Sequence, residues 1–128
     1  MNDYSKVTAE QINNKSEQLA QELANSRITT HQVRNIYSAV QRVRALADQP
    51  DAKPAEINRR LIFLKPKLAY ATGRQGRQSQ DSMRGLQSEI VQAIDGVVRS
   101  EDHRRACENF FFFMESIVAY HKFYGGRD

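Results

Sequence analysis

Apolar residues recur every three or four positions along almost the whole chain, and this spacing constrains the fold more than any other feature. An α-helix, with about 3.6 residues per turn, brings such residues onto one face, whereas a half-buried strand would need apolar and polar residues to alternate. No segment alternates in that way. The sequence therefore predicts an all-α protein, with helices at residues 9–24, 30–47, a segment beginning at Pro54, 82–98 and 101–124.

Capping residues mark several of the expected helix starts. Thr8 with Gln11, and Thr29 with Gln32, have the spacing of a capping box, in which the side chain of each residue accepts a hydrogen bond from the backbone N–H of the other. Ser100 is the expected N-cap of the last helix. The two pairs and Ser100 together predict where three of the helices begin.

Two features interrupt the helical pattern in the middle of the chain. Pro66 lies inside the third helix, and because proline has no backbone N–H, we expect a kink or a restart near Lys65. The segment 72–82, TGRQGRQSQDS, contains two glycines, two arginines and no apolar side chain. We expect it to be an exposed, mobile loop.

The last helix is the most apolar. Phe110, Met114, Ile117 and His121 line one face, which neighbouring aromatic residues broaden, while Phe112 and Phe123 point the other way. A helix that is apolar nearly all round either lies at the centre of its bundle or packs against another subunit. On this apolar face His121 is expected to be a hydrogen-bonded core or interface histidine.

Size and composition favour one domain inside the cell. A chain of 128 residues has the usual length of one domain, so we expect residues 1–128 to form a compact single-domain bundle of about five helices. No apolar run could span a bilayer, and residues 1–15 lack the apolar stretch of a signal peptide. The single cysteine, Cys107, permits no disulfide within the chain. We therefore expect a cytoplasmic protein with no membrane partner.

Positive charge is concentrated in the middle of the sequence. The net charge is +4, but residues 59–84 alone contain seven basic residues opposed by one acidic residue, Asp81. The seven are Arg59, Arg60, Lys65, Lys67, Arg74, Arg77 and Arg84.

Residue patterns typical of metal, nucleotide or covalent chemistry are missing from the sequence. His103 and Cys107 share helical spacing, but two ligands do not make a metal site, and a partly buried cysteine beside a surface histidine is the simpler interpretation. Gly73 and Gly76 lack the Lys and Ser or Thr of a P-loop. No signature of an activated Ser or Cys is present. We expect no catalytic residue, no metal and no other cofactor.

A small helical ribonuclease is one alternative. Such enzymes use an Arg followed after four to six residues by a His, whereas only three residues separate Arg27 from His31 and Arg99 from His103. Neither pair matches this spacing well. In this alternative, the change His103→Ala would abolish cleavage of RNA.

The basic segment favours contact with the backbone of a nucleic acid. Several Lys and Arg side chains on one surface release counterions when they meet phosphates, and the planar guanidinium can grip a phosphate with two hydrogen bonds. A solvated face that keeps the protein soluble is the competing interpretation, but such surfaces usually mix both signs of charge. Most aromatic residues lie in the last helix, away from the basic loop, so we expect contact that is independent of base sequence.

Three stretches of the sequence resemble a known family. The C-terminal segment FFFFMESIVAYHKFYGGRD is the most specific of them, and TTHQVRNIYSAVQRVR and LIFLKPKLAYATGR follow the same family's pattern in the same order. Together they cover about half the chain, and they resemble the small subunit of type III-A CRISPR effector complexes, the Csm interference complexes.

The resemblance implies a compact bundle of about five helices without catalytic activity. Several copies would stack as the inner filament of a ribonucleoprotein used in antiviral defence, and would touch guide (CRISPR) RNA and target RNA beside the other subunits. In such complexes the backbone subunits cut target RNA, and the large subunit cleaves DNA and makes cyclic oligoadenylates.

The resemblance also suggests individual contact residues. Phosphate contact is expected from Arg34 and Arg42 in the second helix and from Lys65, Lys67 and Arg74 in the Lys-Pro-Lys segment. Arg77 is added from its place in the expected loop, and Phe112 and Phe123 are candidates for packing against a neighbouring subunit. A helical adaptor that binds only protein is the remaining alternative, and it would show no salt-sensitive affinity for RNA.

Overall fold

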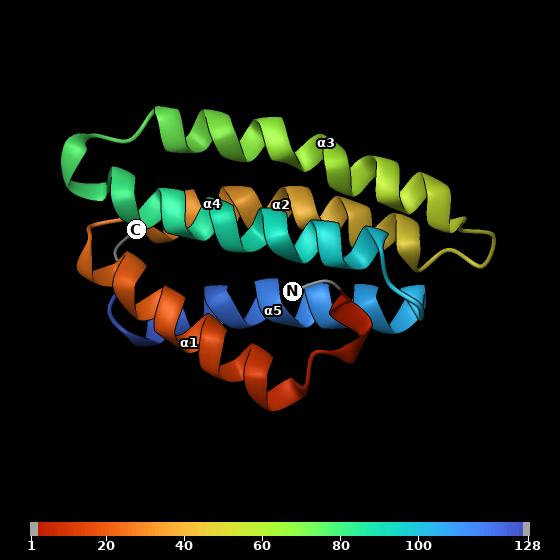
Figure 1. The fold of residues 1–128 in the computed structure, drawn as a ribbon. Helices are drawn as coiled ribbons and strands as arrows, with labels where there is room; N and C mark the ends of the chain where they lie inside the picture. The colour runs from red at the N-terminus through yellow and green to blue at the C-terminus, as the bar shows by residue number, and fades with distance from the viewer. Residues whose placement is uncertain (1–2, 127–128) are drawn as a thin grey trace.

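Five α-helices make up most of the protein (Figure 1). The computed structural model describes residues 3–126, and within this range there is no β-strand. The prediction of an all-α fold is therefore confirmed. The elements are a 3-10 turn η1 (Tyr4–Lys6) and the helices α1 (Ala9–Asn25), α2 (Thr30–Ala47), α3 (Pro54–Gly73), α4 (Arg77–Val98) and α5 (His103–Phe123).

The helix α5 lies at the centre of the bundle, as one of the two interpretations of its apolar character predicts. It packs against α1, α2, α4 and η1, and its side chains Phe110 and Ile117 are completely buried. In contrast, α3 packs mainly on α2 and α4 and lies at the outside of the bundle (Figure 1). The basic residues of α3 are therefore presented on an outer helix.

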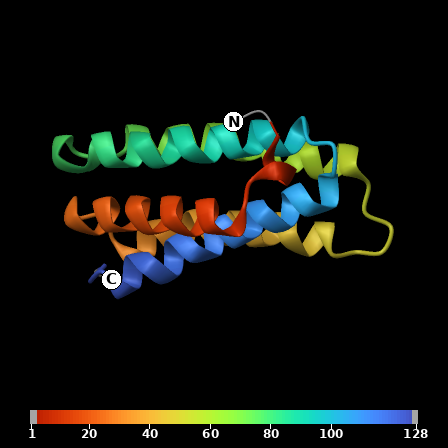
Figure 2. The same cartoon turned by 60° about the horizontal axis from the view of Figure 1, so that its bottom comes forward.

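The N-terminal turn η1 packs against α4 and α5. It bridges α4 and α5, and α1 then runs along α5 (Figure 2). The Asn109 side chain donates hydrogen bonds to the carbonyl oxygens of Tyr4 and Val7, at 2.9 and 3.2 Å. Because Gly96 has no side chain, Tyr4 can pack directly on α4.

The predicted starts of α1, α2 and α3 are confirmed, but those of α4 and α5 are not. Both capping boxes form: the N–H groups of Gln11 and Gln32 each donate to a threonine hydroxyl at 3.1 Å, and each glutamine side chain accepts in return. Ser100 does not cap α5, because its hydroxyl donates to the Val97 carbonyl at 2.7 Å. Asp102 is the cap instead, and its carboxylate accepts from the N–H of Arg105.

Of the kink or restart expected near Lys65, the restart is wrong. The helix α3 runs unbroken from Pro54 to Gly73 with Pro66 inside it. A proline here leaves the carbonyl four residues earlier, that of Ile62, without its helical partner. Both Pro66 and Ile62 are exposed, so water can satisfy that carbonyl and the helix can continue.

The expected loop 72–82 is also wrong. The helix α3 ends at Gly73 and α4 begins at Arg77, which leaves only residues 74–76 as a connection. The Gln75 side chain holds this turn, donating to the Ala71 carbonyl at 3.3 Å and accepting from the Ser79 hydroxyl at 2.8 Å. The segment lacks apolar residues because the first turns of α4 are solvated, and Met83 is the first buried residue of that helix.

The C-terminal ending is part of the core. His121 is completely buried, and its Nε2–H donates to the Ile28 carbonyl at 2.8 Å. The chain then turns at Gly125, whose φ of 89° favours glycine, so that the N–H of Gly126 reaches back to the His121 carbonyl at 2.9 Å. The expectation of a hydrogen-bonded core histidine is confirmed.

Candidate nucleic-acid interface

A surface groove runs between α2 and α3. It has two adjoining sections, and Ala39, Arg42 and Lys67 line both of them. The section toward the start of α3 adds Arg60 and Phe63, and the other section reaches Tyr70, Arg74 and Gln75. No Asp or Glu is among the described residues that line either section. We refer to this feature as the α2–α3 groove.

Most of the predicted phosphate-binding residues have no carboxylate partner. Eight ion pairs form among residues 3–126, and none of them includes Arg34, Arg42, Lys67, Arg74 or Arg77. All five side chains are exposed. Like charges held together on a solvated face repel one another, so an anion that joined them would be favoured.

The structure brings three of the six predicted residues together and places the others around them. Arg42, Lys67 and Arg74 line the α2–α3 groove. Arg34 is exposed on α2 but is not among the lining residues, and Arg77 is the first residue of α4 rather than part of a loop.

Lys65 lies on the other flank of α3. Its Nζ is 2.6 Å from a carboxylate oxygen of Asp95 on α4, and both side chains are about two-thirds buried. This lysine is thus partnered within the fold, unlike the five other predicted residues. Phosphate contact by Lys65 stays a prediction, in which its ammonium group would meet the phosphate in competition with Asp95.

Two aromatic residues beside the groove were missed by the sequence analysis. Phe63 is 54% exposed and Tyr70 is 68% exposed, and both lie on α3 among the basic residues. The expectation that the aromatic residues are remote from the basic segment is therefore wrong for these two. Positions 63, 67, 70 and 74 alternate between aromatic and basic at helical spacing, and that signal is visible in the sequence.

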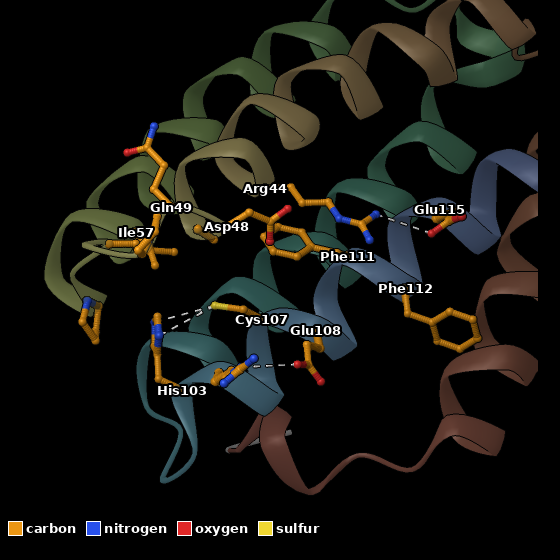
Figure 3. A pocket seen from close by; sticks show the side chains of 15 residues that line it. Arg44, Asp48, Gln49, Ile57, His103, Cys107, Glu108, Phe111, Phe112 and Glu115 are labelled. Atoms are coloured by element: carbon orange, nitrogen blue, oxygen red, sulfur yellow. Dashed lines mark hydrogen bonds and ion pairs between the residues drawn. The ribbon is translucent and has the colours of Figure 1, made fainter.

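The candidate subunit-interface residues share one face of α5. Phe112 is 41% exposed and Phe123 is 75% exposed, and about three helical turns separate them. Figure 3 shows Phe112 at the margin of the hollow that Phe111 and Ile57 also line. Both residues are thus available for contact with another molecule.

His103 and Cys107 lie in that separate hollow, at the start of α5 (Figure 3). The Nε2 of His103 is 2.7 Å from the side-chain oxygen of Asn58, and burial lowers the pKa of this histidine. Burial, together with the nearby charge of Glu108, raises the pKa of the Cys107 thiol to about 11. The thiol is therefore protonated at neutral pH and a weak nucleophile.

Within residues 3–126, no three His, Cys, Asp or Glu side chains are grouped so that they could hold one metal ion. In the same part of the chain, no helix is both long enough and apolar enough to cross a bilayer.

The fold and this surface define a class of protein: a small α-helical bundle with a basic groove between α2 and α3, in which Arg42, Lys67 and Arg74 have no carboxylate partner within residues 3–126. A family model described as Csm2 Type III-A matches residues 6–127, nearly the whole chain. The chain belongs to this family, that of the small subunit of the type III-A CRISPR Csm complex. The resemblance inferred from the sequence is confirmed. Neither a curated protein nor a solved structure gave a significant match.

Proposed function

We propose that this chain is a non-catalytic small subunit of a type III-A CRISPR ribonucleoprotein that binds guide and target RNA by their sugar–phosphate backbones. The α2–α3 groove is the observation that carries the proposal, because Arg42, Lys67 and Arg74 line it together without a carboxylate. Membership of the family supplies the assembly and the other subunits as partners. The setting would be antiviral defence in the cytoplasm.

The chemistry of the groove suits a strand rather than a single anion. Arg42, Lys67 and Arg74 come from two helices and follow the groove through both of its sections, so successive phosphates could each meet a cation. Arg34 and Arg77 would extend this path on either side. Each contact releases counterions from the RNA and makes the affinity depend on salt.

Binding of the full-length protein to single-stranded RNA of arbitrary sequence, measured across a salt series, tests the proposal. For single strands, the logarithm of the affinity falls by about 0.7 per logarithm of salt for each phosphate contacted. The triple change Arg42→Ala, Lys67→Ala and Arg74→Ala should therefore flatten the slope by about 2 and weaken binding.

A matched control removes the same number of charges elsewhere. Lys6, Lys15 and Arg104 are partnered with carboxylates outside the groove, so changing all three to Ala alters the net charge equally. This control variant should keep most of the wild-type slope. Equal loss in both variants would mean that RNA responds only to net charge, and no binding by the wild type would favour the protein-only adaptor.

The proposal includes contact between copies of the chain through the exposed face of α5. Phe112 and Phe123 present aromatic surface there, and aromatic residues are enriched where protein interfaces are buried. The variant Phe112→Ser with Phe123→Ser should reduce the number of copies that assemble with RNA and the other subunits, as counted by native mass spectrometry. An unchanged copy number would assign the stacking contact to another face.

The non-catalytic role is supported by the environment of His103, which is engaged with Asn58 and lies in a different hollow from the groove cations. The purified protein should leave RNA intact over hours. Cleavage that disappears in His103→Ala would establish the ribonuclease alternative instead.

A further inference from the structure

Two exposed aromatic rings border the basic groove on α3. Phe63 lines the section of the groove toward the start of α3, and Tyr70 lines the other section. They are about two helical turns apart, a separation of about 10 Å along the axis. More than half of each side chain is exposed, which is unusual for residues of this size in a helical bundle.

Each ring is accompanied by an arginine. The guanidinium carbon of Arg59 lies 4.8 Å from the centroid of the Phe63 ring, and that of Arg74 lies 5.6 Å from the centroid of Tyr70. These cation–π contacts place a guanidinium over one face of each ring. Arg59 is also paired with Glu56 at 3.7 Å, whereas Arg74 has no carboxylate partner within residues 3–126. A nucleotide has the matching pair of groups, a flat base for the aromatic ring and a phosphate for the arginine.

We propose that the α2–α3 groove is a binding site for an unpaired RNA strand, in which bases stack on Phe63 and Tyr70 while the cations hold the phosphates. This inference rests on the proposed RNA binding and adds a second kind of contact to it. Stacking on aromatic side chains tolerates any base, because every base has a π-face. The site would therefore remain independent of sequence but would reject duplexed RNA, whose bases are covered.

The spacing of the rings adds a constraint on the strand. Bases in a continuous stack are about 3.4 Å apart along the axis, roughly a third of the separation of the two rings. The strand must therefore be extended and partly unstacked where it passes Phe63 and Tyr70. Unpaired RNA can adopt this form at little cost, and a duplex cannot.

The surrounding charge favours RNA over a protein partner. The hollow beside Phe112 on α5 contains Glu108 and Glu115, each paired with an arginine. On α3, Glu56 pairs with Arg59 and Arg60. Lys67 and Arg74 beside the α3 rings have no carboxylate partner within residues 3–126, so an uncompensated positive charge remains there. The described lining of the α2–α3 groove contains no carboxylate that would repel a phosphate. Of the two exposed aromatic surfaces, only that of α3 suits a polyanion.

Ring and charge variants give different signatures in the salt series. Phe63→Leu and Tyr70→Leu should each weaken binding of single-stranded RNA by about 5- to 150-fold without changing the salt slope. Lys67→Ala should instead flatten the slope by about 0.7. Tyr70→Phe keeps the ring and should bind as the wild type does. Val98→Ala removes exposed apolar surface on α4, outside both sections of the groove, and should also leave affinity unchanged. Circular dichroism of each variant would verify that it is folded.

A spectroscopic measurement reports stacking directly. The chain has no tryptophan, so Tyr70→Trp places a single tryptophan at the site, and its emission can be excited separately from that of the tyrosines. Its emission should be quenched when single-stranded RNA is added, and a duplex of the same length should quench it much less. Val98→Trp, at the end of α4 and outside both sections of the groove, supplies the control and should not respond to either RNA.

The outcomes separate this inference from the proposed function. If the ring variants bind like the wild type while Lys67→Ala weakens binding, stacking is wrong and backbone binding stands. If the wild type binds no RNA, both the proposed backbone binding and the stacking are wrong. If Tyr70→Leu leaves RNA affinity intact but prevents assembly with other subunits, the α3 rings form a protein interface and the inference is overturned.

Discussion

Among single residues, His121 shows how the C-terminal ending serves the fold. Its ring is completely buried, with Nε2–H donating to the Ile28 carbonyl and Nδ1 without a hydrogen-bond partner in the described part of the chain. Burial lowers the pKa of His121, the bond to Ile28 acts in the opposite direction, and the charge of Lys122 lowers the pKa further. The neutral ring is the form that fits this site.

Protonation of His121 should destabilise the protein in acid. Because the pKa of His121 in the folded state lies below its ordinary value of 6.5, the unfolded chain binds the proton more readily as pH falls through 6.5. The free energy of unfolding should therefore decrease below that pH, by at most about 1.4 kcal/mol per pH unit from this group. The free energy of unfolding of the wild type and of His121→Gln, measured with urea between pH 7 and 5, tests this. If it falls equally with pH in both proteins, the prediction is contradicted.

Gly126 should be sensitive to the smallest side chain. A Cβ there would overlap the imidazole of His121, so Gly126→Ala should lower the free energy of unfolding by about 1–3 kcal/mol. Gly73→Ala is the control, because at the end of α3 no atom lies within 4 Å of the added Cβ. Thermal denaturation should show a lower Tm for the first variant and an unchanged or slightly higher Tm for the second.

Among the helices, α3 tolerates a proline at a cost that can be measured. Pro66→Ala restores an N–H that can donate to the Ile62 carbonyl, so it should raise the free energy of unfolding by up to about 3 kcal/mol. Pro54→Ala should change it little, since a proline in the first turn removes no helical hydrogen bond. If both variants unfold in urea with the wild-type free energy of unfolding, Pro66 does not destabilise α3.

Over the whole molecule, we expect the groove cations to contribute little to folding stability. Arg42, Lys67 and Arg74 form no ion pair within residues 3–126, so the triple Ala variant should be within about 0.5 kcal/mol per site of wild-type stability. At low salt it should be slightly more stable, because fewer like charges repel one another. A large loss of stability in urea would show instead that these side chains support the packing of α3 on α2.

The sequence-based predictions were most accurate where they depended on interactions between residues close together in the chain. The bounds of α2 and the start of α1 were predicted closely, because a capping box and an apolar stripe act over one or two turns. The restart near Pro66 and the loop at 72–82 were wrongly predicted, because both rested on the low helix propensity of proline and glycine. Tertiary context can override such a propensity. The start of α5 moved by two residues for a similar reason, since Ser100 found another acceptor.

The sequence was enough to establish an all-α chain, a basic middle segment and the family, since each depends on residue types at short spacing. Only the tertiary structure divided the basic residues into those that line the α2–α3 groove and Lys65, whose partner Asp95 lies thirty positions away on another helix. The exposure of Phe63 and Tyr70 was likewise decided by packing, because α3 packs mainly on α2 and α4, and no described element covers these two side chains. Helix-to-helix contacts, which a linear pattern does not encode, thus determined which charges and rings could meet a ligand.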